Sequence, residues 1–155
     1  MKTRVPPPVV TLAVGLLMWL GDRLLPALAF TFPGQGPLAL VLAAAGVLLM
    51  GVAVLSFARA KTTVNPLRPS RASALVTGGV YRFSRNPIYL ADLLLLLAFA
   101  AWLGSLAALA VSPLLVWYLN VFQIAPEEEA LEKLFGDEYR AYCTRVRRWL
   151  QLRPG

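Results

Sequence analysis

The residues best suited to chemistry lie at 81–92, which read YRFSRNPIYLAD and lead into an almost purely apolar run. Arg85 offers a planar guanidinium that suits a carboxylate or a phosphate. Tyr89 and Asp92 are three residues apart, so they share one face of a helix. Asp92 lies about one turn inside the apolar run, where an ionisable residue is a candidate functional group. Its role stays open: it lines a pocket, or it pairs with a neighbouring arginine and only holds helices together.

Further polar side chains end another apolar run. Asn120 and Gln123 lie near its end, and three glutamates follow at 127–129. These groups predict a polar pocket, rich in Arg and Glu, at the edge of an apolar bundle. Such a pocket suits a charged, water-borne molecule that meets a lipophilic one. For Asn120 and Gln123, hydrogen bonding between helices is the alternative.

Composition excludes several kinds of chemistry. The chain has no histidine, and Cys143 is its one cysteine. A histidine-based triad, a histidine-ligated metal and a cysteine cluster are therefore excluded, and we expect no metal site. The sequence also has no Gly-rich phosphate loop ending in Lys-Ser/Thr, which argues against an ATP-dependent enzyme.

The elements that position these residues are membrane helices. Of the 155 residues, 58% are hydrophobic and only 15% are charged, whereas soluble domains have roughly 45–50% apolar residues. The formal net charge is +7. Because apolar runs surround the basic residues, we interpret the charge as matching an anionic leaflet rather than nucleic acid.

Four apolar stretches are long enough to cross a bilayer, which takes about 20 helical residues. They cover residues 9–32, 37–58, 88–103 and 105–124. Asp22 and Arg23 lie inside the first, where they pair, snorkel or break the span. Gly46 and Gly51 offer small faces for helix packing in the second, and Gly104 suits a tight turn after the third. We expect one all-α integral membrane domain, residues 1–155, with the first stretch retained rather than cleaved as a signal peptide.

Charge sets the predicted orientation. Six Lys or Arg residues separate the second and third spans, five Arg residues follow the fourth, and the short loops near Gly34 and Gly104 carry none. The positive-inside rule then places both termini and the long loop in the cytoplasm. After Pro126 the chain becomes amphipathic, with Gly136 as a candidate interruption. This pattern predicts a cytoplasmic amphipathic helix whose arginines face lipid phosphates.

The sequence between residues 60 and 150 resembles the isoprenylcysteine carboxyl methyltransferases and their relatives, the membrane phospholipid methyltransferases. The following residues match that pattern in order and spacing: Gly79-Val80-Tyr81, Arg85-Asn86-Pro87-Ile88-Tyr89, Glu127-Glu128, Leu131, Phe135-Gly136, Tyr139, Tyr142 and Arg145-Val146. Two residues depart from it. Asn86 stands where eukaryotic members have His, and Arg147 stands where Pro is usual.

The resemblance implies that S-adenosylmethionine is the methyl donor and S-adenosylhomocysteine the product. Residues 59–155 would then be the family core with the cofactor pocket, preceded by two spans in residues 1–58. Carried over by position, the cofactor-binding residues are Tyr81, Arg85, Asn86, Tyr89, Glu128 and Arg145. Of these, Arg85, Glu128 and Arg145 are the candidate catalytic residues, and Asp92 and Asn120 are candidates for contact with the substrate.

We therefore expect a membrane methyltransferase that acts on a lipophilic carboxylate, amine or thiol at the cytoplasmic interface of a bacterial inner membrane. A carboxylate acceptor is already nucleophilic, whereas an amine or a thiol needs a base such as Glu128 or Asp92. Two alternatives stay open: an NADPH-dependent lipid reductase, because sterol reductases have a related C-terminal half, or a scaffold without catalysis. We expect the bilayer and a lipophilic acceptor as partners, and no nucleic acid.

Overall fold

The computed structural model describes residues 5–60 and 73–153, and this part of the chain is helical. The elements are α1 (Pro7–Leu24), η1 (Pro26–Leu28), α2 (Gln35–Arg59), η3 (Gly79–Arg82), α3 (Pro87–Leu103), α4 (Leu106–Val111), α5 (Pro113–Tyr118), η4 (Leu119–Ile124), α6 (Ala125–Phe135) and α7 (Asp137–Arg145). The expected all-α architecture is confirmed.

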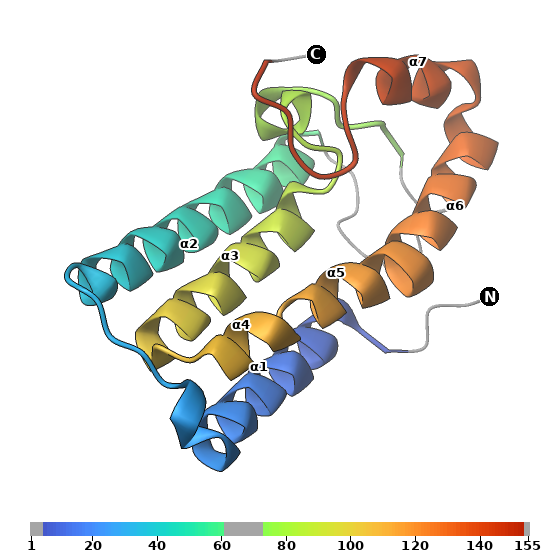
Figure 1. Cartoon of the computed structure of the whole chain (residues 1–155). Coiled ribbons are helices and arrows are strands. Elements are labelled where there is room, and N and C mark those ends of the chain that lie inside the picture. Colours follow the sequence, from blue (N-terminus) through green and yellow to red (C-terminus); the bar gives the residue numbers. More distant parts are fainter. Residues whose placement is uncertain (1–4, 61–72, 154–155) are drawn as a thin grey trace.

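The bundle is built from three main helix pairings. Helix α2 packs along the length of α3, and α1 packs against α3 and α4 (Figure 1). The segments α4, α5, η4 and α6 form one continuous helical run of 30 residues, Leu106–Phe135. Side chains of α1, α3 and this run form the main buried core, which includes Met18, Leu96, Leu115 and Leu119.

Three of the helical runs are long and apolar enough to cross a membrane: Pro7–Leu24, Gln35–Arg59 and Leu106–Phe135. Helix α3 is apolar but shorter, with 17 residues, and it reaches about 25 Å at 1.5 Å per residue. The outward-facing side chains of α1 and α2 are largely Leu and Val. Outward-facing apolar side chains of this kind fit contact with hydrocarbon, so the molecule is an integral membrane protein.

The first predicted span, residues 9–32, extends beyond the C-terminal end of the helix that the structure shows. Helix α1 stops at Leu24, so Asp22 and Arg23 occupy its last turn rather than its middle. Pro26 follows, and a residue before proline is disfavoured in helical conformation. The Arg23 guanidinium lies 5.7 Å from the centre of the Trp19 ring, which places both groups at the end of the helix. The first span therefore ends directly after its two charged residues.

One end of the bundle holds the α1–α2 connection and the α3–α4 turn. Gly104 ends α3 with a left-handed φ of 63°, and its carbonyl accepts a 2.7 Å hydrogen bond from the Phe30 N–H. A Cβ at Gly104 would lie 2.3 Å from the Phe30 carbonyl oxygen. The tight turn predicted here is confirmed, and it also holds the connection from α1.

The expected small-residue contact is confirmed at one glycine. A Cβ at Gly46 of α2 would lie 3.0 Å from the Leu95 side chain and 3.2 Å from the Ala91 carbonyl of α3. Gly46 therefore lets the two helices approach closely. A Cβ at Gly51 would meet nothing within 4 Å, so the prediction of packing there is wrong.

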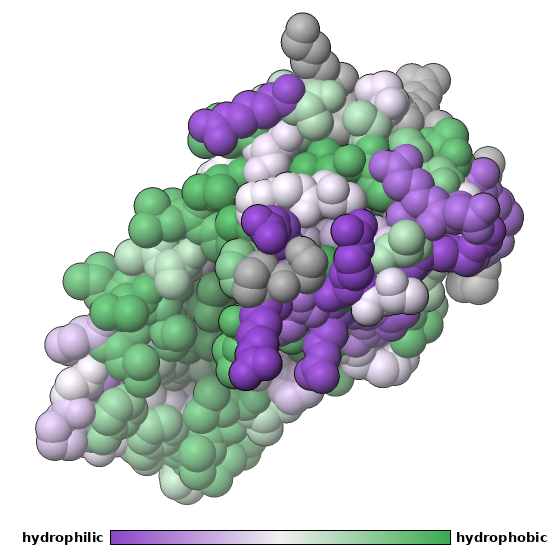
Figure 2. All heavy atoms as spheres, turned by 90° about the horizontal axis from the view of Figure 1, so that it is seen from above, coloured by the Kyte–Doolittle hydropathy of each residue, from purple (hydrophilic) through white to green (hydrophobic). Residues whose placement is uncertain are grey.

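The opposite end of the bundle is closed by a cap, which comprises residues 73–86, α7 and residues 146–153 (Figure 1). The Arg85 N–H donates to the Arg147 carbonyl at 3.0 Å, and the Gln151 N–H donates to the Phe83 carbonyl at 2.9 Å. Figure 2 shows polar residues gathered at this end, while most of the other visible surface is apolar. These bonds tie the C-terminal segment to the residues that enter α3.

The amphipathic helix predicted after Pro126 continues the fourth span instead of starting anew. The π-helical turn η4 joins α5 to α6, and Pro126 is the second residue of α6. A proline removes one backbone hydrogen bond inside a helix, and the wider π turn accommodates that loss. The predicted interruption at Gly136 is confirmed: this residue has φ 53° and separates α6 from α7.

Candidate functional site

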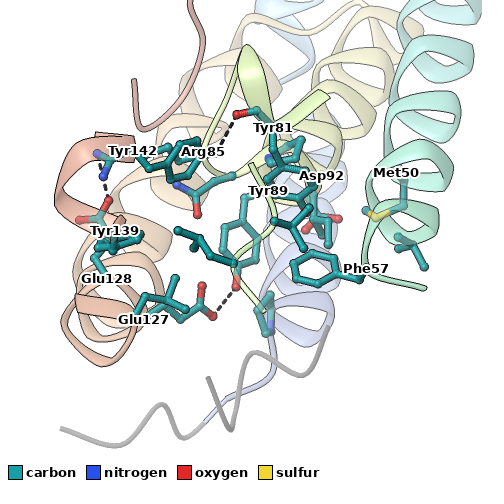
Figure 3. Close-up of a pocket in the computed structure, with 18 of the residues that line it drawn as sticks. Met50, Phe57, Tyr81, Arg85, Tyr89, Asp92, Glu127, Glu128, Tyr139 and Tyr142 are labelled. Atoms are coloured by element: carbon teal, nitrogen blue, oxygen red, sulfur yellow. Dashed lines mark hydrogen bonds and ion pairs between the residues drawn. The ribbon is translucent and has the colours of Figure 1, made fainter. Parts of the chain in front are cut away.

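A cavity of about 300 Å³ lies beneath the cap, between the start of α1, the second half of α2, the start of α3, and α6 and α7. Most of its wall is apolar or aromatic, and its ionisable groups are few. Figure 3 shows Arg85, Tyr89, Asp92, Glu127 and Glu128 around it, with Phe57 and Met50 on the α2 side. Apolar walls with a few convergent polar groups are typical of small-molecule sites.

Glu127 is held at the cavity by two donors from different elements. The Tyr89 hydroxyl of α3 donates to Glu127 Oε1 at 2.7 Å. The side-chain amide of Gln123, which is fully buried in η4, donates to the same oxygen. Because η4 and α6 are continuous, Gln123 and Glu127 share one helical face. The carboxylate is therefore fixed in place while it lines the cavity.

Glu128 lies between two arginines. Arg85 Nη2 is 3.2 Å from Glu128 Oε1. Arg148 donates to both carboxylate oxygens, from Nε at 3.1 Å and from Nη2 at 2.5 Å. The side chains of Arg85 and Glu128 are 15% and 19% exposed, so this ion pair is largely shielded from water. Hydrogen bonding to Glu128 raises the pKa of Arg148.

The guanidinium group of Arg85 uses two of its three nitrogens in contacts with other side chains. Its Nη1 donates to the Cys143 thiol and its Nη2 faces Glu128. The buried Nε has no hydrogen-bond partner among the residues that the structure describes. A buried donor without a partner is costly, which makes this nitrogen a candidate contact for a ligand.

Three buried tyrosines form the wall under the cap. The Tyr142 hydroxyl donates to the Tyr81 carbonyl at 2.6 Å, and the Tyr81 ring meets the Phe57 ring edge-on at 5.4 Å. Burial raises the pKa of Tyr81, Tyr139 and Tyr142 well above the usual range. These phenols therefore stay protonated, and their rings give the cavity a neutral aromatic wall.

The structure brings six of the eight predicted site residues to the cavity: Tyr81, Arg85, Asn86, Tyr89, Asp92 and Glu128. Asn86 also has a structural role there, because its side-chain amide donates to the Arg148 carbonyl at 3.0 Å. Asp92 is 8% exposed and forms no ion pair within the described parts of the chain. The pairing with an arginine considered for Asp92 is therefore not seen.

The other two predicted residues lie elsewhere. Arg145 is exposed on α7 and its Nε donates back to the Ala141 carbonyl, so it does not line the cavity. Asn120 Oδ1 accepts from Trp149 Nε1 at 3.2 Å and from Arg148 Nη1 at 3.4 Å. Asn120 thus binds the C-terminal segment through these two hydrogen bonds.

Glu127, Arg148, Tyr139 and Tyr142 were not among the predicted site residues. The four-residue spacing of Gln123 and Glu127 could have identified Glu127, because it continues the polar face of the fourth span. Nothing in the sequence marks Arg148, since its position depends on how the chain returns after α7. Among the described residues there is no cluster of three metal-binding side chains.

Comparison with known proteins identifies one family and two relatives. The sequence profile of the phospholipid methyltransferase family matches residues 35–138. An uncharacterized protein of Haemophilus influenzae is 56% identical over 64 residues, which cover 41% of this chain and all of that protein. A protein-S-isoprenylcysteine O-methyltransferase of Schizosaccharomyces pombe is 31% identical over 80 residues, 52% of this chain and 34% of that enzyme. No solved structure matches.

Proposed function

The chain belongs to the phospholipid methyltransferase family, and on this premise we propose that it is a membrane methyltransferase that uses S-adenosylmethionine and acts on a lipophilic acceptor. The cavity beneath the cap is the proposed site. The fission yeast relative, named as an isoprenylcysteine O-methyltransferase, supports the reaction class. The observation that carries the proposal is that this one cavity combines fixed carboxylates, an aromatic wall and Arg85.

The residues fit the cofactor. S-adenosylmethionine carries a sulfonium and an ammonium, which favour carboxylates and aromatic faces; Glu127 and the tyrosine wall supply these. It also carries a carboxylate, for which the unpartnered Nε of Arg85 is a suitable donor. The cavity volume of about 300 Å³ lies at the lower end of the range for ligand pockets.

When bound, the cofactor would supply a methyl group already activated for displacement. The chain's own residues then need to align the acceptor with that methyl and to exclude water, rather than to cleave a strong bond. Glu127, fixed by Tyr89 and Gln123, would orient the donor, and Arg85 with Glu128 would close the cavity under the cap. Arg145 remains a predicted contact that the static geometry does not support.

Two alternatives have less support. NADPH carries several phosphates, but Arg85 is the only cation among the described lining residues, and it already faces Glu128. A scaffold would have no need for carboxylates fixed at a buried cavity. Arg82, Arg145, Arg147, Arg148 and Arg153 all lie in the cap, which supports a cytoplasmic cap in a bacterial inner membrane, with both termini on that side.

Cofactor binding tests the proposal. We would titrate the full chain in lipid nanodiscs with S-adenosylmethionine, S-adenosylhomocysteine and NADPH by calorimetry. Binding of both methionine derivatives and not of NADPH is the expected result. Glu127→Gln should weaken that binding at least tenfold, whereas Glu132→Gln, an exposed change on the same helix, should not. Binding of NADPH alone would replace the proposal with the reductase alternative.

A further inference from the structure

The arginines of the cap fall into two groups according to their partners. Arg85, Arg140 and Arg148 each face a carboxylate. Within the described parts of the chain no acidic side chain pairs with the others, which are exposed: Arg82, Arg145, Arg147 and Arg153. None of this second group lines the cavity. Their charges therefore face the surroundings of the protein rather than the proposed site.

Three of these arginines meet at one glutamine. The side-chain nitrogen of Gln151 donates at 3.1 Å to the carbonyls of both Arg82 and Arg145. Its side-chain oxygen accepts from the Arg147 N–H at 2.9 Å. Arg82 ends η3, Arg145 ends α7, and Arg147 belongs to the C-terminal segment that crosses the entry to α3 (Figure 1). One buried amide contact point thus gathers cations from three segments, and we call these three residues the arginine patch.

Exposed apolar side chains flank the arginine patch. Phe83 is 40% exposed, and its carbonyl accepts from the Gln151 N–H at 2.9 Å. Leu150 and Leu152 stand on either side of Gln151 in the chain and are 52% and 92% exposed. Arginines interleaved with exposed large apolar side chains are typical of segments that lie in the headgroup region of a bilayer.

We propose that the arginine patch binds the phosphate groups of anionic phospholipids in the leaflet next to the cap, while Phe83, Leu150 and Leu152 enter the boundary of the acyl chains. Guanidinium groups form strong, often bidentate hydrogen bonds with phosphate oxygens. An anionic leaflet also attracts basic residues near its surface. This lipid is a partner of the outer surface and not a substrate, because no residue of the patch lines the cavity. The inference goes beyond the proposed function and does not depend on it.

A lipid surface suits this patch better than a soluble acidic partner. The chain is an integral membrane protein, and the cap closes one end of its helices, so headgroups adjoin the cap at high local concentration. A soluble acidic protein would match the three arginines, but it would have to displace those headgroups. It would also have to cover the exposed leucines, which a bilayer accommodates without a specific contact.

Lipid binding should hold the C-terminal segment in place. The chain is extended after α7, and neighbouring residues of an extended chain point to opposite sides. Arg147 is exposed, whereas Arg148 binds Glu128. A phosphate held by Arg147 therefore favours the arrangement in which the next residue closes over the cavity.

Hydrogen–deuterium exchange measures this effect without any cofactor. We would compare the full chain in nanodiscs of phosphatidylcholine with the same chain in nanodiscs of equal parts phosphatidylcholine and phosphatidylglycerol. The Arg147 and Gln151 amides should exchange about fivefold more slowly in the anionic nanodiscs, which is the factor expected from one basic residue near an anionic surface. The difference should disappear in 1 M salt, where the screening length falls to about 3 Å.

Two double variants separate the patch from net charge. Arg82→Gln with Arg147→Gln removes two charges of the patch but keeps the backbone groups that Gln151 binds, so the lipid-dependent difference should fall below about twofold. Lys133→Gln with Arg140→Gln is the matched control. It also removes two positive charges, but both of these side chains already pair with carboxylates, so the difference should persist.

Equal exchange of the wild-type chain in the two nanodiscs would overturn the inference, and so would the same loss of the difference in both double variants. Two further arms add a deca-glutamate peptide or inorganic phosphate to the phosphatidylcholine nanodiscs. Protection by either one that matches the anionic lipid would also overturn it, in favour of a soluble acidic partner or a free anion. Because S-adenosylmethionine is absent from every arm, these outcomes leave the proposed function untouched.

Discussion

Tyr89 and Glu127 lie 38 residues apart in the chain, and a 2.7 Å hydrogen bond joins the Tyr89 hydroxyl to Glu127 Oε1. This bond connects α3 to α6, the two elements that bring the carboxylates of Asp92, Glu127 and Glu128 to the cavity. It also fixes which way the Glu127 carboxylate points. The position of the carboxylate therefore depends on a residue from the motif that precedes the helical hairpin.

Replacing Tyr89 tests this relationship. Tyr89→Phe keeps the ring and removes the donor, so Glu127 loses one of its two partners. A hydrogen bond to a charged group contributes about 1.5–3 kcal/mol, and we expect S-adenosylhomocysteine to bind about tenfold more weakly by calorimetry. Tyr118→Phe on α5 is the control, because the Tyr118 side chain packs on Phe122 away from the cavity. Equal affinities in the two variants would show that Glu127 needs no help from Tyr89.

Arg148 should matter more than its place near the chain end suggests. Arg148→Met removes both hydrogen bonds to Glu128 and leaves that carboxylate with Arg85 alone. Because the Arg148 side chain is 38% exposed, we expect only about 1–2 kcal/mol of lost stability, with weaker cofactor binding. Thermal unfolding and calorimetry measure the two effects. Arg153→Met, an exposed arginine in the same segment, is the matched control, and a similar effect from both would refute a specific role for Arg148.

Gly104 should tolerate no side chain. In Gly104→Ala the new Cβ would lie 2.3 Å from the Phe30 carbonyl oxygen, at a φ of 63° that L residues rarely adopt. We expect a loss of about 2–4 kcal/mol, measured as a lower unfolding temperature in nanodiscs. Gly51→Ala places the same methyl group where nothing lies within 4 Å and should be neutral or stabilising. The reverse ranking would contradict the described turn.

Local patterns predicted the fold because membrane helices follow from hydropathy over about 20 residues. They also predicted the turn at Gly104 and the interruption at Gly136, where the backbone adopts a positive φ. The predicted end of the first span was wrong because the apolar pattern of the sequence continues past Leu24, where the helix stops. The charges in the last turn of α1 and Pro26 stop the helix before the hydropathy falls.

The site was predicted less completely, and the reasons are geometric. Arg145 and Arg148 are equivalent in the sequence, but the chain leaves helical conformation at Val146, which has φ −122° and ψ 130°. The extended segment then returns over the cavity, so Arg148 reaches Glu128 while Arg145 stays on the outer face of α7. Only tertiary structure makes that distinction.

The effect of Arg147 at the position where proline is usual also depends on tertiary contacts. The usual proline at this position would remove a backbone N–H, whereas the Arg147 N–H donates to Gln151 Oε1 at 2.9 Å. Gln151 in turn donates to the Arg82 carbonyl at 3.1 Å. A local hydrogen bond in the cap thus accommodates the departure from the family pattern, and the exposed Arg147 does not line the cavity.

Alkaline pH should destabilise the cap. Burial raises the pKa of Tyr81, Tyr139 and Tyr142, whereas an unfolded tyrosine ionises near pH 10. Above that pH the unfolded state loses protons that the folded state keeps, so stability falls as pH rises, by up to about 1.4 kcal/mol per pH unit for each tyrosine. Thermal unfolding between pH 8 and pH 11, followed by tyrosinate absorbance, measures this slope. Tyr142→Phe also removes the 2.6 Å bond to the Tyr81 carbonyl, so it should lower stability at pH 8 and flatten the slope above pH 10. An unchanged slope in that variant would mean that its phenol ionises as freely in the folded protein as in the unfolded chain.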